Sequence, residues 1–212
     1  MILYYSPGAC SLVPHIALEE AGAVYEAKRV VLAEGEHLTP DYLAINPHAR
    51  VPALDVDGQV VTENVAILNY IAHRWGAPGA VPLEDHLAAA RCNQLLGWFA
   101  SSVHIGFAQV WRAERFSDDQ AVHAAIQSGG HDVLKRYFGQ IEELAGDGWL
   151  VPGEFSAADS YALVFFRWGR RIGTDMSPYP RWRALVDRVL ERPAVQKVLA
   201  KEGFEAAEFI PA

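Results

Sequence analysis

Cys10 is the residue whose type and position most directly suggest chemistry. It follows a short apolar run, residues 2–5, and a turn, residues 6–9, and it comes immediately before a pattern typical of a helix. A thiol at that place faces the N–H groups and the positive dipole end of the helix, which stabilise a thiolate and lower a cysteine pKa. The position predicts sulfur chemistry, performed by Cys10 or by a bound thiol. A free cysteine is also commonly a small apolar filler, and position alone does not decide between the two.

A second feature is the dipeptide Val51-Pro52 at the start of a predicted strand. If this bond is cis, the neighbouring backbone groups are free to pair with a peptide-like ligand that docks as an added strand. A trans proline on an edge strand explains the same residues. The sequence leaves both isomers open.

A third feature is Thr62-Glu63-Asn64 at the start of the next predicted helix. Free N–H groups at a helix start favour a carboxylate, and the Glu63 carboxylate can accept from an ammonium group. The pair therefore suits the α-amino acid end of a ligand. The alternative is structural, with Thr62 as the helix cap.

Apolar runs and turn residues predict β-α-β, an irregular segment and then β-β-α in the first part of the chain. The expected strands lie at 2–5, 25–32, 51–56 and 59–61, and the expected helices at 11–21 and 62–75, with a helical turn near 41–45. A Gly/Pro-rich segment follows, and the rest shows only helical periodicity. These helices are predicted at 84–115, 118–145, 157–171, 180–191 and 194–202. The sequence thus predicts an α/β domain over 1–76, a linker over 77–83 and an all-helical domain over 84–212. β-α-β followed by β-β-α, with a cysteine at the first helix start, is the thioredoxin-like arrangement.

Ser156 and Asp159 precede an apolar run and have the spacing of a capping box, with Asp in the usual Glu position. We interpret this pair as a structural feature that starts a helix.

Composition narrows the functional classes. The net charge is −8, which argues against a nucleic-acid surface. No apolar run approaches the ~20 residues that span a bilayer, and we expect no secretory signal and no membrane partner. Two cysteines are too few for a disulfide framework, so we expect a cytoplasmic protein. The eight histidines form no metal-binding pattern, and we expect no metal.

Basic residues do cluster locally, at Arg112, Arg115, Arg167, Arg170 and Arg171. A solvated helix face that carries salt bridges is the favoured interpretation. The alternative is a patch that meets an anionic substrate.

Several segments together resemble the cytosolic glutathione transferases, and the bacterial beta class in particular. The resemblance rests on Leu3 to Leu12, Pro14 to Leu18, Asn46-Pro47 with Val51 to Leu54, Thr62 to Ile67, Val103 to Gly106, and Phe155 to Asp159. It spans nearly the whole chain. It implies glutathione as co-substrate, a homodimer and a role in detoxification.

The resemblance also implies roles for individual residues. Cys10 would lie against the glutathione sulfur and could form a mixed disulfide with it, and His104 would sit near both sulfurs. Alone, His104 on an apolar helix is more often a core histidine, but the resemblance reverses that weighting. Val51, held by Pro52, would bind the cysteinyl unit, Glu63 and Asn64 would bind the γ-glutamyl end, and Tyr5 and Ser11 are hydroxyl alternatives for polarising the thiol.

Three positions depart from the family pattern. Asn64 replaces the common Ser, and Ala49-Arg50 replaces Gly-Gln or Gly-Lys. The loop at 34–36, Glu-Gly-Glu, stands where a lysine often meets the glycyl carboxylate. Losing one charge-assisted hydrogen bond costs about 1.5–3 kcal/mol, although Arg50 or His37 could compensate.

The resulting hypothesis is a glutathione transferase that attacks an apolar electrophile. Phe107, Trp111 and Trp168 would line the second-substrate surface, although each also fits core packing at its helical spacing. One alternative is glutathione-dependent thiol-disulfide exchange through Cys10. The other is a non-catalytic ligand-binding or interaction protein whose glutathione site has decayed.

Overall fold

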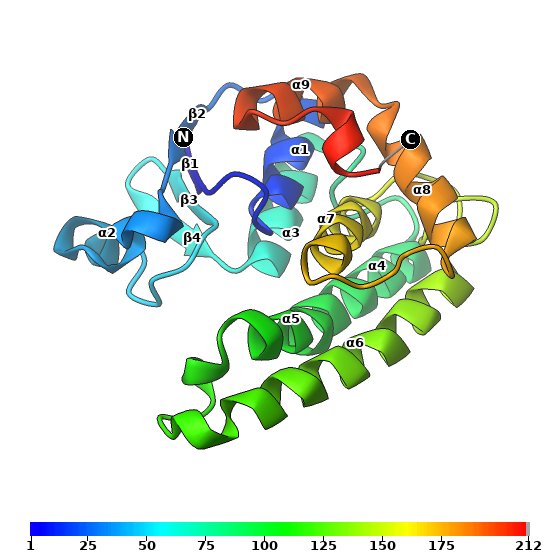
Figure 1. Ribbon diagram of the computed structural model, residues 1–212. Coiled ribbons are helices and arrows are strands. Elements are labelled where there is room, and N and C mark those ends of the chain that lie inside the picture. Colours follow the sequence, from blue (N-terminus) through cyan, green and yellow to red (C-terminus); the bar gives the residue numbers. More distant parts are fainter. Residues whose placement is uncertain (211–212) are drawn as a thin grey trace.

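The fold, a computed structural model described here for residues 1–210, begins with a four-stranded mixed sheet and ends in helices (Figure 1). The strands are β1 (Ile2–Tyr5), β2 (Glu26–Arg29), β3 (Ala53–Val56) and β4 (Gln59–Thr62). The sheet order is β2-β1-β3-β4; β1 pairs parallel with β2 and antiparallel with β3, which pairs antiparallel with β4. The α-helices are α1 (Leu12–Glu20), α2 (Pro40–Ile45), α3 (Asn64–Trp75), α4 (His86–Trp98), α5 (His104–Trp111), α6 (His123–Leu144), α7 (Ala157–Arg171), α8 (Pro180–Leu190) and α9 (Pro193–Glu202). The predicted thioredoxin-like domain followed by a helical domain is confirmed.

Elements differ from the predictions in two places. The second strand ends at Arg29, after which the chain turns into short 3-10 helices at Leu32–Glu34 and Glu36–Leu38. The helix predicted over 84–115 is divided, because a π-helical turn at Phe99–Val103 separates α4 from α5. Sequence periodicity does not reveal the π-helical turn, because a single extra residue in one helical turn leaves the apolar pattern almost unchanged.

Alternating side chains of β1 enter different apolar clusters. Leu3 and Tyr5 join the main core with α1 and α3, whereas Tyr4 packs with Tyr42 of α2 in a small cluster on the other face. This follows from the two-residue period of a strand. In Figure 1, α2 accordingly lies far from α1 and α3, on the other side of the strands.

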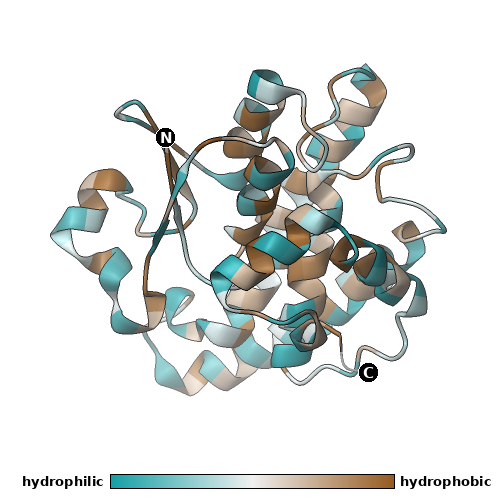
Figure 2. Cartoon of the chain, turned by 90° about the horizontal axis from the view of Figure 1, so that it is seen from above, coloured by the Kyte–Doolittle hydropathy of each residue, from teal (hydrophilic) through white to brown (hydrophobic). Residues whose placement is uncertain are grey.

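Helix α1 is the structural centre of the molecule. It packs against α3 of its own domain and against α7 and α9 of the helical part. All residues from Leu12 to Leu18 are buried, so this helix has no polar face of the kind a surface helix shows. Figure 2 shows the apolar colouring concentrated in the central helices and the hydrophilic colouring on the outer ones.

The segment expected to link the domains, 77–83, lies between α3 and α4 and contains no helix or strand. This segment is packed against the rest of the protein. Ala80 and Val81 are buried, the N–H of Gly79 donates to Phe155 O at 3.1 Å, and Ala80 O accepts from the N–H of Ala157 at 3.0 Å. The exact boundaries at 76 and 84 stay a prediction.

The capping box is present where the sequence predicted it. Asp159 is fully buried and its carboxylate accepts from the N–H of Ser156 at 2.8 Å and from the N–H of Leu150 at 2.8 Å. The pair therefore starts α7 and also holds the preceding loop.

Candidate active site

Cys10 lies at the end of the loop between β1 and α1, and its side chain is buried. Its Sγ donates to the carbonyl oxygen of Val51 at 3.6 Å. The first helix and the loop before β3 are thus brought together at the sulfur, although 41 residues separate them in the chain.

The protonation of Cys10 is the opposite of the sequence expectation. Burial raises the pKa of the Cys10 thiol to about 12, and the negative charge of Glu63 adds to this effect. A hydrogen bond from the Cys10 backbone N–H, one from Asn64 and the positive charge of Arg50 lower the pKa, but burial outweighs them. The pKa is raised rather than lowered because desolvation of the buried sulfur outweighs the effect of the helix N-terminus.

The Val51-Pro52 bond is cis. Among residues 1–210, no acceptor pairs with the N–H of Val51. The preceding Arg50 is held through its backbone, because its carbonyl accepts from the Tyr42 hydroxyl and from Asn46 Nδ2, both at 2.7 Å. An ordered loop thus presents an unpaired N–H beside Cys10, while the Arg50 side chain is exposed.

Glu63 and Asn64 lie at the start of α3, close to Cys10. Glu63 is exposed and has φ 65° and ψ 125°, an unusual conformation for a residue with a side chain. Such strain costs on the order of 1–3 kcal/mol and concentrates at functional sites. Asn64 is buried; its Nδ2 donates to Cys10 O at 3.1 Å and to the Tyr161 hydroxyl at 2.6 Å. Thr62 makes no cap, since Glu63 is the N-cap residue and no side chain caps α3.

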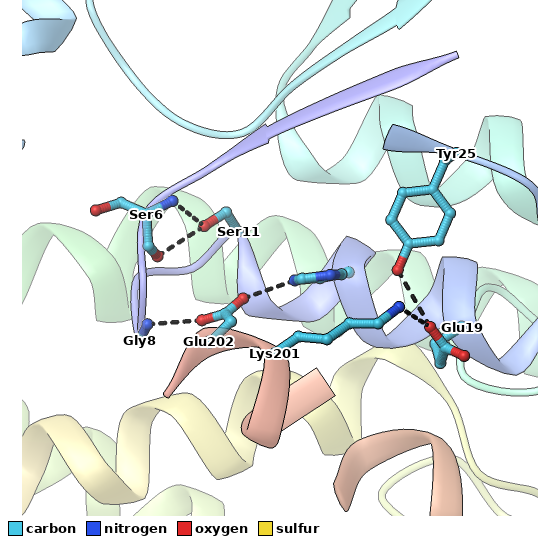
Figure 3. A network of polar contacts seen from close by, with 8 residues as sticks. Ser6, Gly8, Ser11, Glu19, Tyr25, Lys201 and Glu202 are labelled. Carbon is cyan, nitrogen blue, oxygen red and sulfur yellow. Dashed lines mark hydrogen bonds and ion pairs between the residues drawn. The ribbon is translucent and has the colours of Figure 1, made fainter. Parts of the chain in front are cut away.

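Ser11 and Tyr5 lie on the inner side of the loop. The Ser11 hydroxyl accepts from the N–H of Ser6 at 3.1 Å and donates to Ser6 O at 3.2 Å (Figure 3). Its donor and its acceptor are therefore both used within the loop. Tyr5 is buried and its ring packs against His15 at a centroid distance of 5.0 Å. Burial and the charge of Glu202 raise the pKa of Tyr5.

Glu202 holds the Cys10 loop from the other end of the chain. Its carboxylate accepts from the N–H of Gly8 at 2.8 Å and contacts His15 Nδ1 at 2.8 Å, and both side chains of this pair are fully buried (Figure 3). The carbonyl of Gly8 accepts from Trp168 Nε1 at 2.9 Å. The helical domain therefore binds both the N–H and the carbonyl oxygen of Gly8 and so fixes the loop.

His104 is the first residue of α5 and lies half-buried against Trp168, with ring centroids 5.2 Å apart. Burial lowers the pKa of His104 to about 4, and the charges of Arg50 and Arg115 act in the same direction. Its imidazole is therefore neutral at pH 7 and offers one N–H donor and one acceptor.

The three aromatic residues expected at the second-substrate surface are in contact but differ in exposure. Trp111 is 36% exposed, and its ring lies 5.2 Å from that of Trp168, which is largely buried. Phe107 is fully buried, stacked between Trp111 and Phe165, and so lies behind this surface.

The basic cluster divides into two groups. Arg167 and Arg170 contact the C-terminal segment, the first over the ring of Phe204 at 4.3 Å and the second through a bond to Glu208 O at 3.0 Å. Arg112 and Arg115 instead lie beside His37, whose pKa is lowered by burial and by these two charges. The salt-bridged helix face is wrong, because within residues 1–210 none of the five arginines is paired with a carboxylate.

Sequence reasoning missed Glu202, Trp168 as a hydrogen-bond donor, and Tyr161. Glu202 had a usable signal, since it continues the buried face of α9 at the spacing of Val195, Val198 and Leu199. A carboxylate on an apolar helix face needs a partner in the core. The partner itself, the N–H of Gly8, could not be read from the sequence.

Within residues 1–210, no group of three or more His, Cys, Asp or Glu side chains is arranged to hold a metal ion. In the same part of the chain, no helix has the length and apolarity to cross a bilayer.

The mixed sheet and the cis-proline beside a cysteine define a thioredoxin-like protein. A second, helical domain packs against the loop that carries the cysteine. Residues 1–73 match the family described as "Glutathione S-transferase, N-terminal domain" and residues 116–193 match "Glutathione S-transferase, C-terminal domain". The chain belongs to the glutathione S-transferase family.

Individual relatives agree with this membership. The chain is 31% identical to glutathione S-transferase GST-4.5 of Xanthomonas campestris pv. campestris, over 96% of this chain and 99% of that protein. A glutathione transferase homologue from Sulfitobacter, solved with bound glutathione, superposes with a TM-score of 0.89 at 33% identity, over 96% of this chain and 98% of the other. The bacterial beta class glutathione S-transferase of Sphingomonas chungbukensis superposes with a TM-score of 0.82 at 35% identity, over 96% and 99% of the two chains.

Proposed function

We propose that this protein is a glutathione transferase, which activates the thiol of glutathione for attack on an electrophile. The observation that carries the proposal is the unpaired N–H of Val51 next to cis-Pro52, beside Cys10 and the strained start of α3. An extended peptide needs such a backbone donor, and its α-amino acid end suits Glu63 with the N–H groups of α3. The family membership and the glutathione bound to the Sulfitobacter relative support the same ligand.

In this proposal the hydrogen-bond donors around the sulfur favour the glutathione thiolate. A free thiol titrates near about 8.5 and is mostly protonated at neutral pH. At the Cys10 position a backbone N–H and Arg50 lower the pKa of a thiol, while Glu63 raises it, so the donors rather than the net charge would favour a thiolate bound next to Cys10. Cys10, protonated because burial raises its pKa to about 12, and neutral His104 each supply a hydrogen-bond donor. The sulfur electron pair then forms the bond to carbon while the electrophile's leaving group departs with its own pair.

Arg50 and His37 are proposed to bind the glycyl carboxylate in place of the absent lysine. The acidic loop opposes them less than its composition suggests, since the Glu36 carboxylate accepts from the N–H of Val31 at 2.7 Å within its own loop. This contact weakens the main support for a non-catalytic protein with a decayed site. Tyr5 and Ser11 remain secondary candidates, because the Ser11 hydroxyl is already bonded to Ser6 at both functions.

Thiol-disulfide exchange through Cys10 is the less supported activity. It needs a thiolate at Cys10, and burial raises the pKa of this residue to about 12. The Cys10→Ala variant separates the two activities, because we expect it to abolish exchange but only to lower the rate of conjugation through the loss of one hydrogen-bond donor.

We also propose a homodimer, a cytoplasmic location and a role in detoxification. The dimer is supported by a hollow of about 530 Å³ between α4 and α6, which Leu95, Trp98 and the exposed Leu144 help to line. Two unpaired cysteines fit a reducing compartment. Sedimentation equilibrium tests the dimer, and a purely monomeric protein at 10 times the assay concentration would contradict it.

The test of glutathione binding is thermal unfolding with and without millimolar reduced glutathione, on protein checked by intact mass for a Cys10 adduct. A ligand at 100 times its dissociation constant stabilises by about 2.7 kcal/mol, and we expect a clear upward shift of Tm. Glu63→Gln should reduce the shift, whereas Glu84→Gln, a matched change at an exposed site, should not. No shift in the wild-type protein would refute the transferase proposal.

A further inference from the structure

Two arginines at the end of α5 have no evident structural partner. Arg112 and Arg115 are both exposed, and within residues 1–210 neither side chain forms an ion pair or a hydrogen bond. Arg112 follows directly after Trp111, and Arg115 belongs to the 3-10 turn Ala113–Arg115. Their charges are available to a ligand.

These arginines belong to the helical domain, and their charges act on groups of the candidate active site. Arg115 lowers the pKa of both His37 and His104, which belong to different domains, and Arg50 and Arg112 in turn lower the pKa of Arg115. Such mutual effects require the groups to lie close together. No acidic group is among the charges that act on the two histidines. Glu114 acts on Arg115 with the opposite sign, but the charges that reach the two histidines are positive.

An apolar surface adjoins these positive charges. Trp111 and Trp168 are in edge-to-face contact at 5.2 Å, and Trp168 reaches the Cys10 loop through its bond to Gly8 O. A fourth arginine, Arg171, lies over the Trp111 ring at 5.9 Å and is exposed. A flat apolar group on Trp111 would thus have cations near its rim.

The carboxylates of glutathione do not account for all of these charges. One is placed in our proposal at the start of α3, and the other at Arg50 and His37 on the thioredoxin-like domain. The helical domain carries Arg112, Arg115 and Arg171, as it carries the apolar surface formed by Trp111 and Trp168. Their position is that of groups that contact the second substrate.

We infer that the second substrate is an electrophile with an apolar ring and an anionic group, such as a carboxylate, that Arg112 and Arg115 bind. This inference rests on the proposed transferase function and replaces its purely apolar electrophile. Arg-carboxylate pairs are short, directional and about twice as strong as neutral hydrogen bonds. The ring would stack on Trp111 while its reactive carbon meets the glutathione sulfur.

The test compares 4-chloro-3-nitrobenzoate with its methyl ester as co-substrates of glutathione. In both, sulfur bonds to the ring carbon that carries chlorine, chloride leaves with the bonding pair, and the thiol proton passes to buffer. The measured quantity is kcat/KM divided by the uncatalysed rate constant, which corrects for the difference in intrinsic reactivity. We expect the wild-type protein to favour the acid over the ester at least tenfold at low salt, and less at high salt because exposed charges are screened.

Arg112→Gln and Arg115→Gln should each lower the acid-to-ester ratio about tenfold, with a smaller effect on KM for glutathione. Arg181→Gln removes the same charge from the exposed start of α8 and should leave the ratio unchanged. Isothermal titration of S-(4-carboxy-2-nitrophenyl)glutathione and its aryl methyl ester should show the same preference in binding alone.

Each of the following results would overturn the inference. Equal loss for acid and ester, or a loss of thermal stability alone, would assign the arginines to the negative dipole end of α5. A large rise in KM for glutathione would assign them to the co-substrate. Turnover of the ester without a preference for the acid would leave the transferase function standing and refute only this inference, whereas turnover of neither, with no binding of glutathione, would refute both.

Discussion

Burial controls the protonation of the two side chains closest to the proposed chemistry. Cys10 is held as a thiol and His104 as a neutral imidazole, because in each case the charged form loses its hydration. Burial is the largest cause in both cases, and the charge of Glu63 on Cys10 and those of Arg50 and Arg115 on His104 act in the same direction. Both residues are therefore suited to donate hydrogen bonds to a bound thiolate rather than to carry the charge themselves.

The first prediction at this scale concerns the reactivity of Cys10. Because burial raises its pKa to about 12, alkylation by iodoacetamide should rise about tenfold per pH unit from pH 7 to 10 without a plateau. Peptide mass spectrometry on the Cys92→Ala variant follows Cys10 alone. A plateau below pH 8 would show a thiolate and restore disulfide exchange as the leading activity.

The second prediction concerns the pH dependence of stability. Because the pKa of His104 is lowered to about 4 in the folded protein, its unfolded form binds more protons between about pH 4 and 6.5. The stability associated with neutral His104 is fully present above pH 6.5 and is lost as the pH falls. From pH 7 to 5 this amounts to about 1–2 kcal/mol.

Urea unfolding at pH 7 and pH 5 measures this difference, and His104→Gln serves as the comparison because Gln does not titrate. The variant should lose about 1–2 kcal/mol less than the wild type over this range. Equal losses in both proteins would mean that His104 is protonated as readily when folded as when unfolded.

At the scale of elements, α9 acts on the loop that carries Cys10. Glu202 is the last residue of that helix and accepts from Gly8 N–H, two residues before Cys10. Gly8 has φ 65°, and a Cβ there would lie 2.4 Å from Arg167 Nη1, so the loop can approach the helical domain only with glycine at this position. The sulfur is thus positioned by contacts from both domains.

Glu202→Ala should therefore destabilise the protein by about 2–4 kcal/mol, because it leaves the N–H of Gly8 and His15 Nδ1 buried without partners. The midpoint and slope of urea unfolding measure the effect, and Glu191→Ala, an exposed carboxylate on the preceding turn, should change stability by less than about 0.5 kcal/mol. An equally small effect of Glu202→Ala would mean that the buried pair is dispensable.

Much at this scale follows from local pattern. The strand-helix order of the first 75 residues and the capping box at Ser156 and Asp159 are correctly predicted because each depends on residues within a few positions. The π-helical turn before His104 and the unpaired arginines after α5 are not, because they depend on how the surrounding elements pack.

At the scale of the whole molecule, α1 joins the two domains into one core. It packs against α7 and α9 as well as α3. The carboxylate of Glu20, at the end of α1, accepts hydrogen bonds from Arg192 Nε at 2.6 Å and Arg192 Nη2 at 2.9 Å. The thioredoxin-like domain therefore buries much of its apolar surface only against the helical domain. Separate folding of the two parts would leave that surface in water.

We accordingly expect one cooperative unfolding transition. Far-UV circular dichroism and tryptophan fluorescence should report the same urea midpoint, because most tryptophans belong to the helical domain while both domains contribute to the dichroism. The isolated fragment 1–83 should fail to fold. Two separated transitions, or a folded fragment, would show that the contacts of α1 with α7 and α9 contribute little.

The sequence by itself determined the order of elements, the family and most of the residues at the proposed glutathione site, because these depend on periodicity, turn residues and short motifs. Only the tertiary structure decided the cis isomer at Val51-Pro52, the protonation of Cys10 and His104, and the separation of Arg112 and Arg115 from Arg167 and Arg170. The physical reason is that hydration and charge depend on every group packed around an atom. Glu202, far from Cys10 in the chain and bonded to its loop, belongs to the same class of fact.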